Sequence, residues 1–149
     1  MTALWRIGEI LIQRKLINWE QLQECLLEQK KTHEFIGEIL VRKKMVPKSL
    51  LYRALAEQFN MRFVDLKRMR INPLAVEKIP ASLARKYQIM PFELTDNTLV
   101  IGITDPLRAW PEEEIRRLAK VNELIKALCL PDDVDQCIRE HYLEKGANV

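Results

Sequence analysis

Glycine is scarce in this chain. Only four of its 149 residues are glycine, and no GxxxxGK[ST] stretch is present, which excludes a phosphate-binding loop of the ATPase kind. Apolar runs are short as well, and none approaches the roughly eighteen residues of a membrane-spanning helix. The N-terminal stretch MTALWRIGEIL has no charged region followed by an apolar run. We therefore expect neither a signal peptide nor membrane insertion.

Cysteine and histidine are also few. The three cysteines are odd in number and form no CxxC pair, which indicates a reduced, cytoplasmic protein without a disulfide scaffold or zinc site. His33 and His141 have no partner at metal-ligand spacing, so we expect no metal. Because no nucleophile–base pair is visible, we predict no enzymatic activity, no catalytic residue and no cofactor.

The chain does contain an internal repeat. A 24-residue pattern runs from Arg6 to Gln29 and returns from Phe35 to Gln58, 29 positions later, with IGEIL identical in both copies. A repeat of this length predicts two copies of one supersecondary unit, packed side by side. The matching ends at Gln29 and Gln58 also suggest a target with two equivalent halves.

Each copy of the repeat is predicted to form a helix, a short turn and a second helix. Its apolar residues recur at helical spacing, and Asn18 followed by Gln21 is typical of a capping box at the start of the second helix. Pro47 and Ser49 mark the corresponding helix start in the second copy. The polar linker between the copies is short, so we expect them to be spatial neighbours.

The pattern changes after Gln58. We predict strands over residues 61–66, 89–94, 98–103 and 124–130, and helices over 74–77, 82–87, 112–120 and 134–143. Turn residues at 95–97 join the second and third strands into a hairpin, and Lys126 makes the last strand an edge candidate. The fold class is therefore α+β. A duplicated four-helix unit over residues 1–60 is expected to pack on a small, mostly antiparallel α+β subdomain over residues 61–149.

The repeat resembles that of the MshEN domain family, the N-terminal (GspE-type) domain of type II secretion and type IV pilus assembly ATPases. Its pattern of Arg-Leu-Gly, later leucines and a final Gln is similar to both copies here. FVDL, the segment from Ile79 to Tyr87 and the Asp105-Pro106 pair also resemble the family. The resemblance implies binding of cyclic di-GMP and attachment to a motor ATPase or its membrane-platform protein. Since no motor sequence is present, a stand-alone domain and an excised fragment both fit.

The resemblance also implies which residues hold the ligand. The matching positions are Arg6, Ile7, Gly8, Leu11, Leu22, Leu26, Gln29, Phe35, Ile36, Gly37, Leu40, Leu51, Leu55, Gln58 and, after a strand, Asp105.

The residues themselves leave alternatives open. Gly8 and Gly37 lie inside helices, where glycine costs roughly 1 kcal/mol relative to alanine, so either a ligand or a neighbouring helix must approach closely. The leucines and isoleucines are expected in the core, with some also touching the ligand. Arg6 and the two glutamines could bind guanine or phosphate, or simply lie on the surface. Asp105 could accept hydrogen bonds from guanine or shape its turn.

Three departures from the family pattern favour a second hypothesis. Lys15 and Lys44 replace the glycine that supplies left-handed backbone at the end of the first helix, at a cost of about 1 kcal/mol each, and Phe35 replaces arginine. The alternative is a docking module of a type II secretion or type IV pilus system with a degenerate nucleotide site. A helix-turn-helix DNA binder using the basic cluster Arg42, Lys43, Lys44 and Lys48 is a weaker third possibility, and DNA is not an expected partner.

Overall fold

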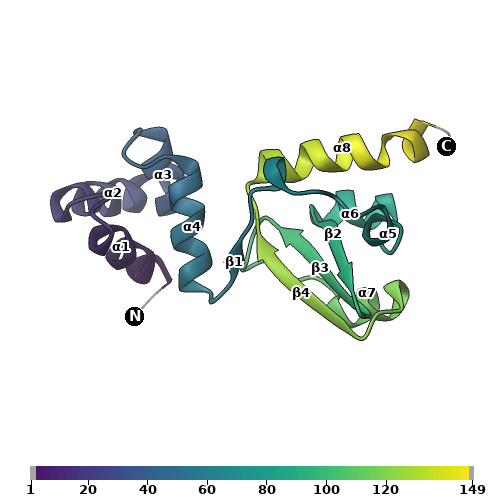
Figure 1. Cartoon of the computed structure of the whole chain (residues 1–149). Coiled ribbons are helices and arrows are strands. Elements are labelled where there is room, and N and C mark those ends of the chain that lie inside the picture. The colour runs from purple at the N-terminus through teal and green to yellow at the C-terminus, as the bar shows by residue number, and fades with distance from the viewer. Residues whose placement is uncertain (1–2, 148–149) are drawn as a thin grey trace. The chain divides into compact units, whose positions relative to one another are not determined.

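The computed structural model describes the backbone of residues 3–147 and the side chains of residues 7–142. The chain divides into two compact units, one ending at Asn60 and the other beginning at Met61. The first unit is helical, and the second combines a four-stranded sheet with helices (Figure 1). The α+β fold class is confirmed.

The helices of the first unit are α1 (Ala3–Gln13), α2 (Trp19–Thr32), α3 (Ile36–Arg42) and α4 (Lys48–Gln58). They confirm the prediction of helix, short turn and helix in each copy. The predicted capping box is present at the start of α2. The Gln21 backbone N–H donates to Asn18 Oδ1 at 2.8 Å, and the Asn18 N–H donates to Gln21 Oε1 at 2.9 Å. Helix α4 begins after Pro47, without a side-chain cap.

The core of the first unit repeats with the sequence. Positions 29 residues apart are buried in both copies, namely Ile7 and Ile36, Leu11 and Leu40, Ile17 and Val46, Leu22 and Leu51, and Cys25 and Ala54. All ten belong to one apolar cluster, so the two copies share a single core. Because one copy alone would leave much of this apolar surface in water, each copy stabilises the other.

The sheet of the second unit has the strand order β1-β4-β3-β2. Strands β2 (Met90–Thr95) and β3 (Thr98–Ile103) form the predicted hairpin, in which Asp96 and Asn97 adopt positive φ angles of 48° and 64°. The sheet is mixed, however, and the prediction of a mostly antiparallel sheet is wrong. Strand β4 (Glu123–Leu128) follows helix α7 (Glu112–Ala119), and this helical crossover returns it parallel to β3. Strand β1 also pairs parallel to β4.

Strand β1 is shorter than predicted. It spans only Arg62–Phe63, because Asp65 Oδ1 accepts from the Lys67 N–H at 3.1 Å and starts the 3-10 helix η1 (Leu66–Arg68). The prediction that β4 is an edge strand is also wrong, since β4 lies between β1 and β3. Strand β1 pairs only with the last two residues of β4.

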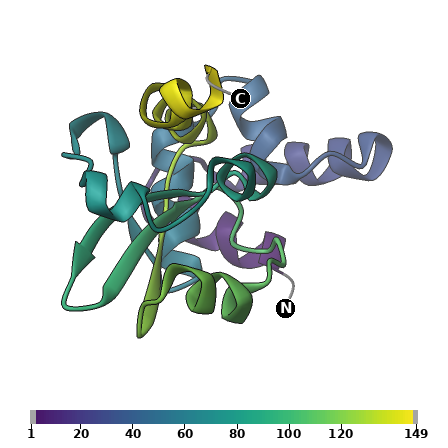
Figure 2. The same cartoon turned by 90° about the vertical axis from the view of Figure 1, so that its right-hand side faces the viewer.

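Three further helices complete the second unit: α5 (Pro73–Val76), α6 (Ala81–Tyr87) and α8 (Pro131–Ala147). The strands run between α7 and α8 (Figures 1 and 2). Helix α8 is longer at both ends than predicted, and its buried Tyr142 fixes it to the segment after α5. The Tyr142 hydroxyl donates to the carbonyl oxygens of Val76 at 3.1 Å and Ile79 at 2.9 Å.

Candidate functional site

The helices of the two copies pack reciprocally. Helix α1 packs on α4, and α2 packs on α3. Two equivalent ion pairs join the copies: Arg14 Nε donates to Glu57 Oε2 at 2.9 Å, and Lys43 Nζ lies 3.4 Å from Glu28 Oε1. Arg14 and Lys43 are 29 positions apart, as are Glu28 and Glu57. The first unit is therefore built like a symmetric dimer within one chain, with the same contact made in both directions.

The two helical glycines allow close packing within each copy. A Cβ atom added at Gly8 would lie 2.9 Å from both Cδ atoms of Leu22, and one added at Gly37 would lie 3.0 Å from Leu51 Cδ2. Separations this short require the leucine to shift. Of the two explanations that the sequence left open, the approach of a neighbouring helix is thus visible in the structure at both positions.

The turns after α1 and α3 have the same conformation. Lys15 and Lys44 have φ angles of 59° and 60°, which confirms left-handed backbone at the place where the family has glycine. In each turn the lysine N–H and the following N–H donate back to the end of the helix. The Leu16 N–H, for example, donates to the Leu11 carbonyl at 2.9 Å. This is a Schellman motif formed without glycine.

Six of the fifteen predicted ligand-binding residues are apolar core residues. Ile7, Leu11, Leu22, Ile36, Leu40 and Leu51 are each at most 5% exposed, as expected from their spacing. Leu26 and Leu55 pack against the same core and remain partly exposed. The side chain of Arg6 lies outside the described residues. Phe35, at 69% exposure, is the large apolar side chain that the second copy presents to solvent before α3.

The polar site residues make local contacts. Gln29 is half-buried, and its Nε2 donates to the Glu34 carbonyl in the linker at 3.1 Å. Gln58, its equivalent, is only 7% exposed, so it is not a solvated helix-end residue. Asp105 belongs to the second unit, where its Oδ1 accepts from the Leu107 N–H at 2.9 Å. The turn-shaping alternative for Asp105 is therefore seen directly.

Two of the four residues of the basic cluster, Arg42 and Lys43, are paired with acidic residues of the first copy and the linker. Arg42 pairs with Glu28 and with Glu34 Oε1, the latter at 2.9 Å, and Lys43 Nζ lies 3.0 Å from Glu24 Oε1. The Glu34 and Glu28 carboxylates raise the pKa of Arg42, and the hydrogen bond from Arg42 lowers the pKa of Glu28. A DNA phosphate backbone would meet these carboxylates too, so this face is poorly suited to DNA.

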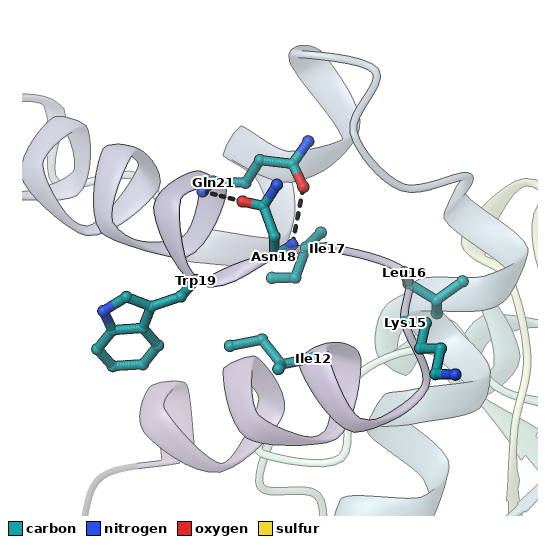
Figure 3. Close-up of a pocket in the computed structure, with 7 residues that line it drawn as sticks. All are labelled: Ile12, Lys15, Leu16, Ile17, Asn18, Trp19 and Gln21. Atoms are coloured by element: carbon teal, nitrogen blue, oxygen red, sulfur yellow. Dashed lines mark hydrogen bonds between the residues drawn. The ribbon is translucent and has the colours of Figure 1, made fainter.

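A hollow of about 460 Å³ lies beside the turn between α1 and α2 (Figure 3). Figure 3 shows Trp19 and Ile12 approaching each other from the two helices. The repeat pattern did not predict this hollow, although the tryptophan directly after the helix cap Asn18 was a possible signal in the sequence. The second copy has Pro47 and Lys48 in place of Asn18 and Trp19, so the lining is not duplicated. A ligand with two equivalent halves would use duplicated residues instead.

Comparison with known proteins establishes the family. The MshEN domain matches residues 59–148, which is more than half of the chain, and the chain belongs to this family. The match covers the second unit, whereas the sequence resemblance rested mainly on the repeats of the first.

Two curated relatives are type IV pilus assembly ATPases named PilB. The protein of Myxococcus xanthus (strain DK1622) is 25% identical over 144 residues, which cover 97% of this chain and 25% of the relative. The protein of Thermus thermophilus is 32% identical over 143 residues, covering 95% of this chain and 15% of the relative. This chain therefore spans a quarter or less of these relatives.

Two solved structures share the fold. A structure of MshE with cdg matches 92% of this chain and 99% of its own at 22% identity, with a TM-score of 0.79. The N-terminal domain of XpsE matches 95% of this chain and 96% of its own at 18% identity, with a TM-score of 0.63.

Two other kinds of feature are absent from the described residues. No helix within residues 3–147 is long and apolar enough to cross a membrane. In the same part of the chain, no group of three or more His, Cys, Asp or Glu side chains could hold a metal ion.

Proposed function

We propose that this chain is a non-enzymatic regulatory module that binds cyclic di-GMP through its two motifs and acts on a cytoplasmic motor ATPase of a type IV pilus or type II secretion system. The observation that carries this proposal is the repeated motif geometry: the two copies share one core, and both the close glycine–leucine contact and the left-handed turn recur in each copy. Cyclic di-GMP consists of two identical guanosine monophosphate halves. The fold shared with MshE, solved with cdg (cyclic di-GMP), supports the same ligand.

Three motif residues with polar or aromatic side chains suggest how the ligand binds. Gln29 Nε2 donates to the Glu34 carbonyl, and this bond fixes the orientation of the Gln29 amide. The Oε1 atom of Gln29 is then the acceptor for a guanine N–H. Phe35 is exposed enough to stack on a base, and Arg6 has the fork of donors that fits guanine O6 and N7. The buried leucines form the core of this unit, while Leu26 and Leu55 offer partly exposed apolar surface.

One set of observations favours a docking module as a second candidate function. Phe35 is exposed where the family has arginine, and Arg42 and Lys43 are already paired with carboxylates. The half-site of the second copy therefore attracts an anion less strongly than the family pattern would. In this alternative, the exposed phenyl ring of Phe35 anchors a protein of the secretion or pilus machinery, such as the membrane-platform protein.

A thermal-shift experiment tests the proposal. Cyclic di-GMP at a hundred times its dissociation constant should stabilise the chain by about 2.7 kcal/mol, which raises the melting temperature by several degrees. Gln29→Ala should reduce the shift, whereas Gln23→Ala, an exposed glutamine on the same helix, should not. GMP should have little effect, because it fills only one half-site. If cyclic di-GMP and GMP give the same small shift, the docking module is favoured instead.

A further inference from the structure

A small pocket in the second unit lies between α8 and the segment that starts with η1. Its volume is about 250 Å³, and Leu66, Lys67, Met69, Asp133, Gln136 and Glu140 are among its lining residues. Helix α8 packs on η1, so both walls belong to the same unit. The volume is below the roughly 300–1,000 Å³ of sites for drug-sized ligands. The pocket is therefore the size of a single side chain and too small for a dinucleotide.

The unusual group in this pocket is the carboxylate of Asp133. The side chain is only 3% exposed, and among the described side chains of residues 7–142 its one ion pair is with Lys67 Nζ at 3.5 Å. Lys67 is itself 68% exposed, so this pair is weak and easily opened. At 3.5 Å the lysine is too distant for a short charge-assisted hydrogen bond, so the carboxylate keeps acceptor capacity on both oxygens. A ligand that brings two donors and positive charge can use this capacity.

The other walls define the shape of that ligand. Glu140, two helical turns along from Asp133, accepts from Gln136 Nε2 at 2.9 Å. The titratable groups of the lining are therefore two carboxylates, Lys67, His141 and the Cys137 thiol. Leu66 and Met69 provide apolar surface beside the charges. A flat, cationic group with two parallel donors fits these features better than a compact ammonium, since it can bind a carboxylate in a fork and lie against apolar side chains.

We propose that this pocket receives an arginine side chain of a partner protein. The guanidinium donates to Asp133, its aliphatic stem lies against Leu66 and Met69, and Lys67 turns outward to solvent. Gln136 and Glu140 are exposed on α8, so the mouth of the pocket opens on a helix face that a partner's backbone can approach. This site belongs to the second unit, whereas the two repeated motifs belong to the first, and its existence does not depend on cyclic di-GMP binding.

A peptide titration tests the proposal. The full chain, labelled with ¹⁵N, is titrated with acetyl-Gly-Arg-Gly-amide while the backbone amides of residues 67, 133 and 136 are followed by NMR. The citrulline peptide, which has the same shape without the charge, and the lysine peptide are the controls. We expect saturable shifts at these amides with arginine, at least several-fold weaker binding with lysine, and none with citrulline. Equal binding of all three peptides, or no arginine-induced shifts at these amides, would overturn the proposal.

Variants make the test specific to Asp133. Asp133→Asn should weaken arginine binding about tenfold or more, while Asp132→Asn, an exposed neighbour outside the pocket, should have no effect. Lys67→Gln should tighten binding about threefold, because it removes the competing cation. If Asp133→Asn does not fold, the other two variants still test the proposal. Lys67→Gln should tighten the binding of the arginine peptide, and Glu140→Gln should weaken it. Weaker binding by Lys67→Gln, or equal binding by both aspartate variants, would show that the proposed contact is wrong.

Discussion

The close packing of Gly8 against Leu22 leads to a quantitative prediction. Replacing a mid-helix glycine by alanine normally stabilises a helix by roughly 0.5–1 kcal/mol. Here the new methyl group would meet both Cδ atoms of Leu22 at 2.9 Å, and Leu22 is completely buried. Overpacking of this kind costs typically about 1–3 kcal/mol. We therefore expect Gly8→Ala to lower the free energy of unfolding by about 1 kcal/mol.

A double-mutant cycle separates the packing penalty from helix propensity. In a Leu22→Ala background the obstruction is gone, and Gly8→Ala should stabilise by roughly 0.5–1 kcal/mol, so the coupling between the two sites is about 2 kcal/mol. Gly37→Ala is the matched comparison and should be nearly neutral, because only one methyl group of Leu51 lies as close as 3.0 Å. Urea unfolding followed by circular dichroism at 222 nm measures all variants. If Gly8→Ala stabilises both backgrounds equally, packing does not explain this glycine.

Three further perturbations test other parts of the structure. Lys15→Gly and Lys44→Gly should each raise the free energy of unfolding by about 0.5–1 kcal/mol, because glycine adopts the positive φ angle of these positions without strain. Lys15→Ala should not stabilise, and a stabilising effect of this variant would contradict the explanation. Arg6→Ala should weaken cyclic di-GMP binding about tenfold or more in calorimetry, and Phe35→Ala less, because a charged hydrogen bond exceeds an exposed apolar contact; equal losses would refute the asymmetry. Burial raises the pKa of the Cys129 thiol from 9.0 to about 12. As the pH rises, the unfolded chain therefore loses this proton first, and the free energy of unfolding should fall between pH 9 and 12. Cys129→Ala should reduce this fall in urea unfolding measured across the same pH range.

The first unit was largely predictable because its determinants are local or repeated. The capping box of Asn18 and Gln21 depends on residues three apart, and the duplicated apolar positions mark the core directly. The left-handed turn at Lys15 was predictable only because the family has glycine there. The reciprocal ion pairs were not predictable, since Arg14 and Glu57 are 43 residues apart and nothing local relates them.

The second unit was less predictable because its sheet depends on long-range pairing. The hairpin of β2 and β3 follows from the turn residues between them, including Asp96 and Asn97. The helix between β3 and β4 was predicted, and such a crossover indicates a parallel pair, so this part of the mixed sheet could have been predicted. The pairing of β1 with β4 depends on long-range contacts that the local pattern does not specify. Lys126 suggested an edge strand, which is wrong because β4 lies between β1 and β3, although β1 pairs only with Ala127 and Leu128. The buried position of Asp133 gave no signal in the sequence, where it belongs to a polar helix start.

The most direct test of the proposed function is a calorimetric titration of the chain with cyclic di-GMP. Since both copies of the motif are proposed to form one site, we predict saturable binding with one dinucleotide per chain, weakened by Gln29→Ala and unaffected by Gln23→Ala. Absence of binding heat at high micromolar nucleotide, together with an unchanged melting temperature, would contradict the nucleotide-binding function and leave the docking module.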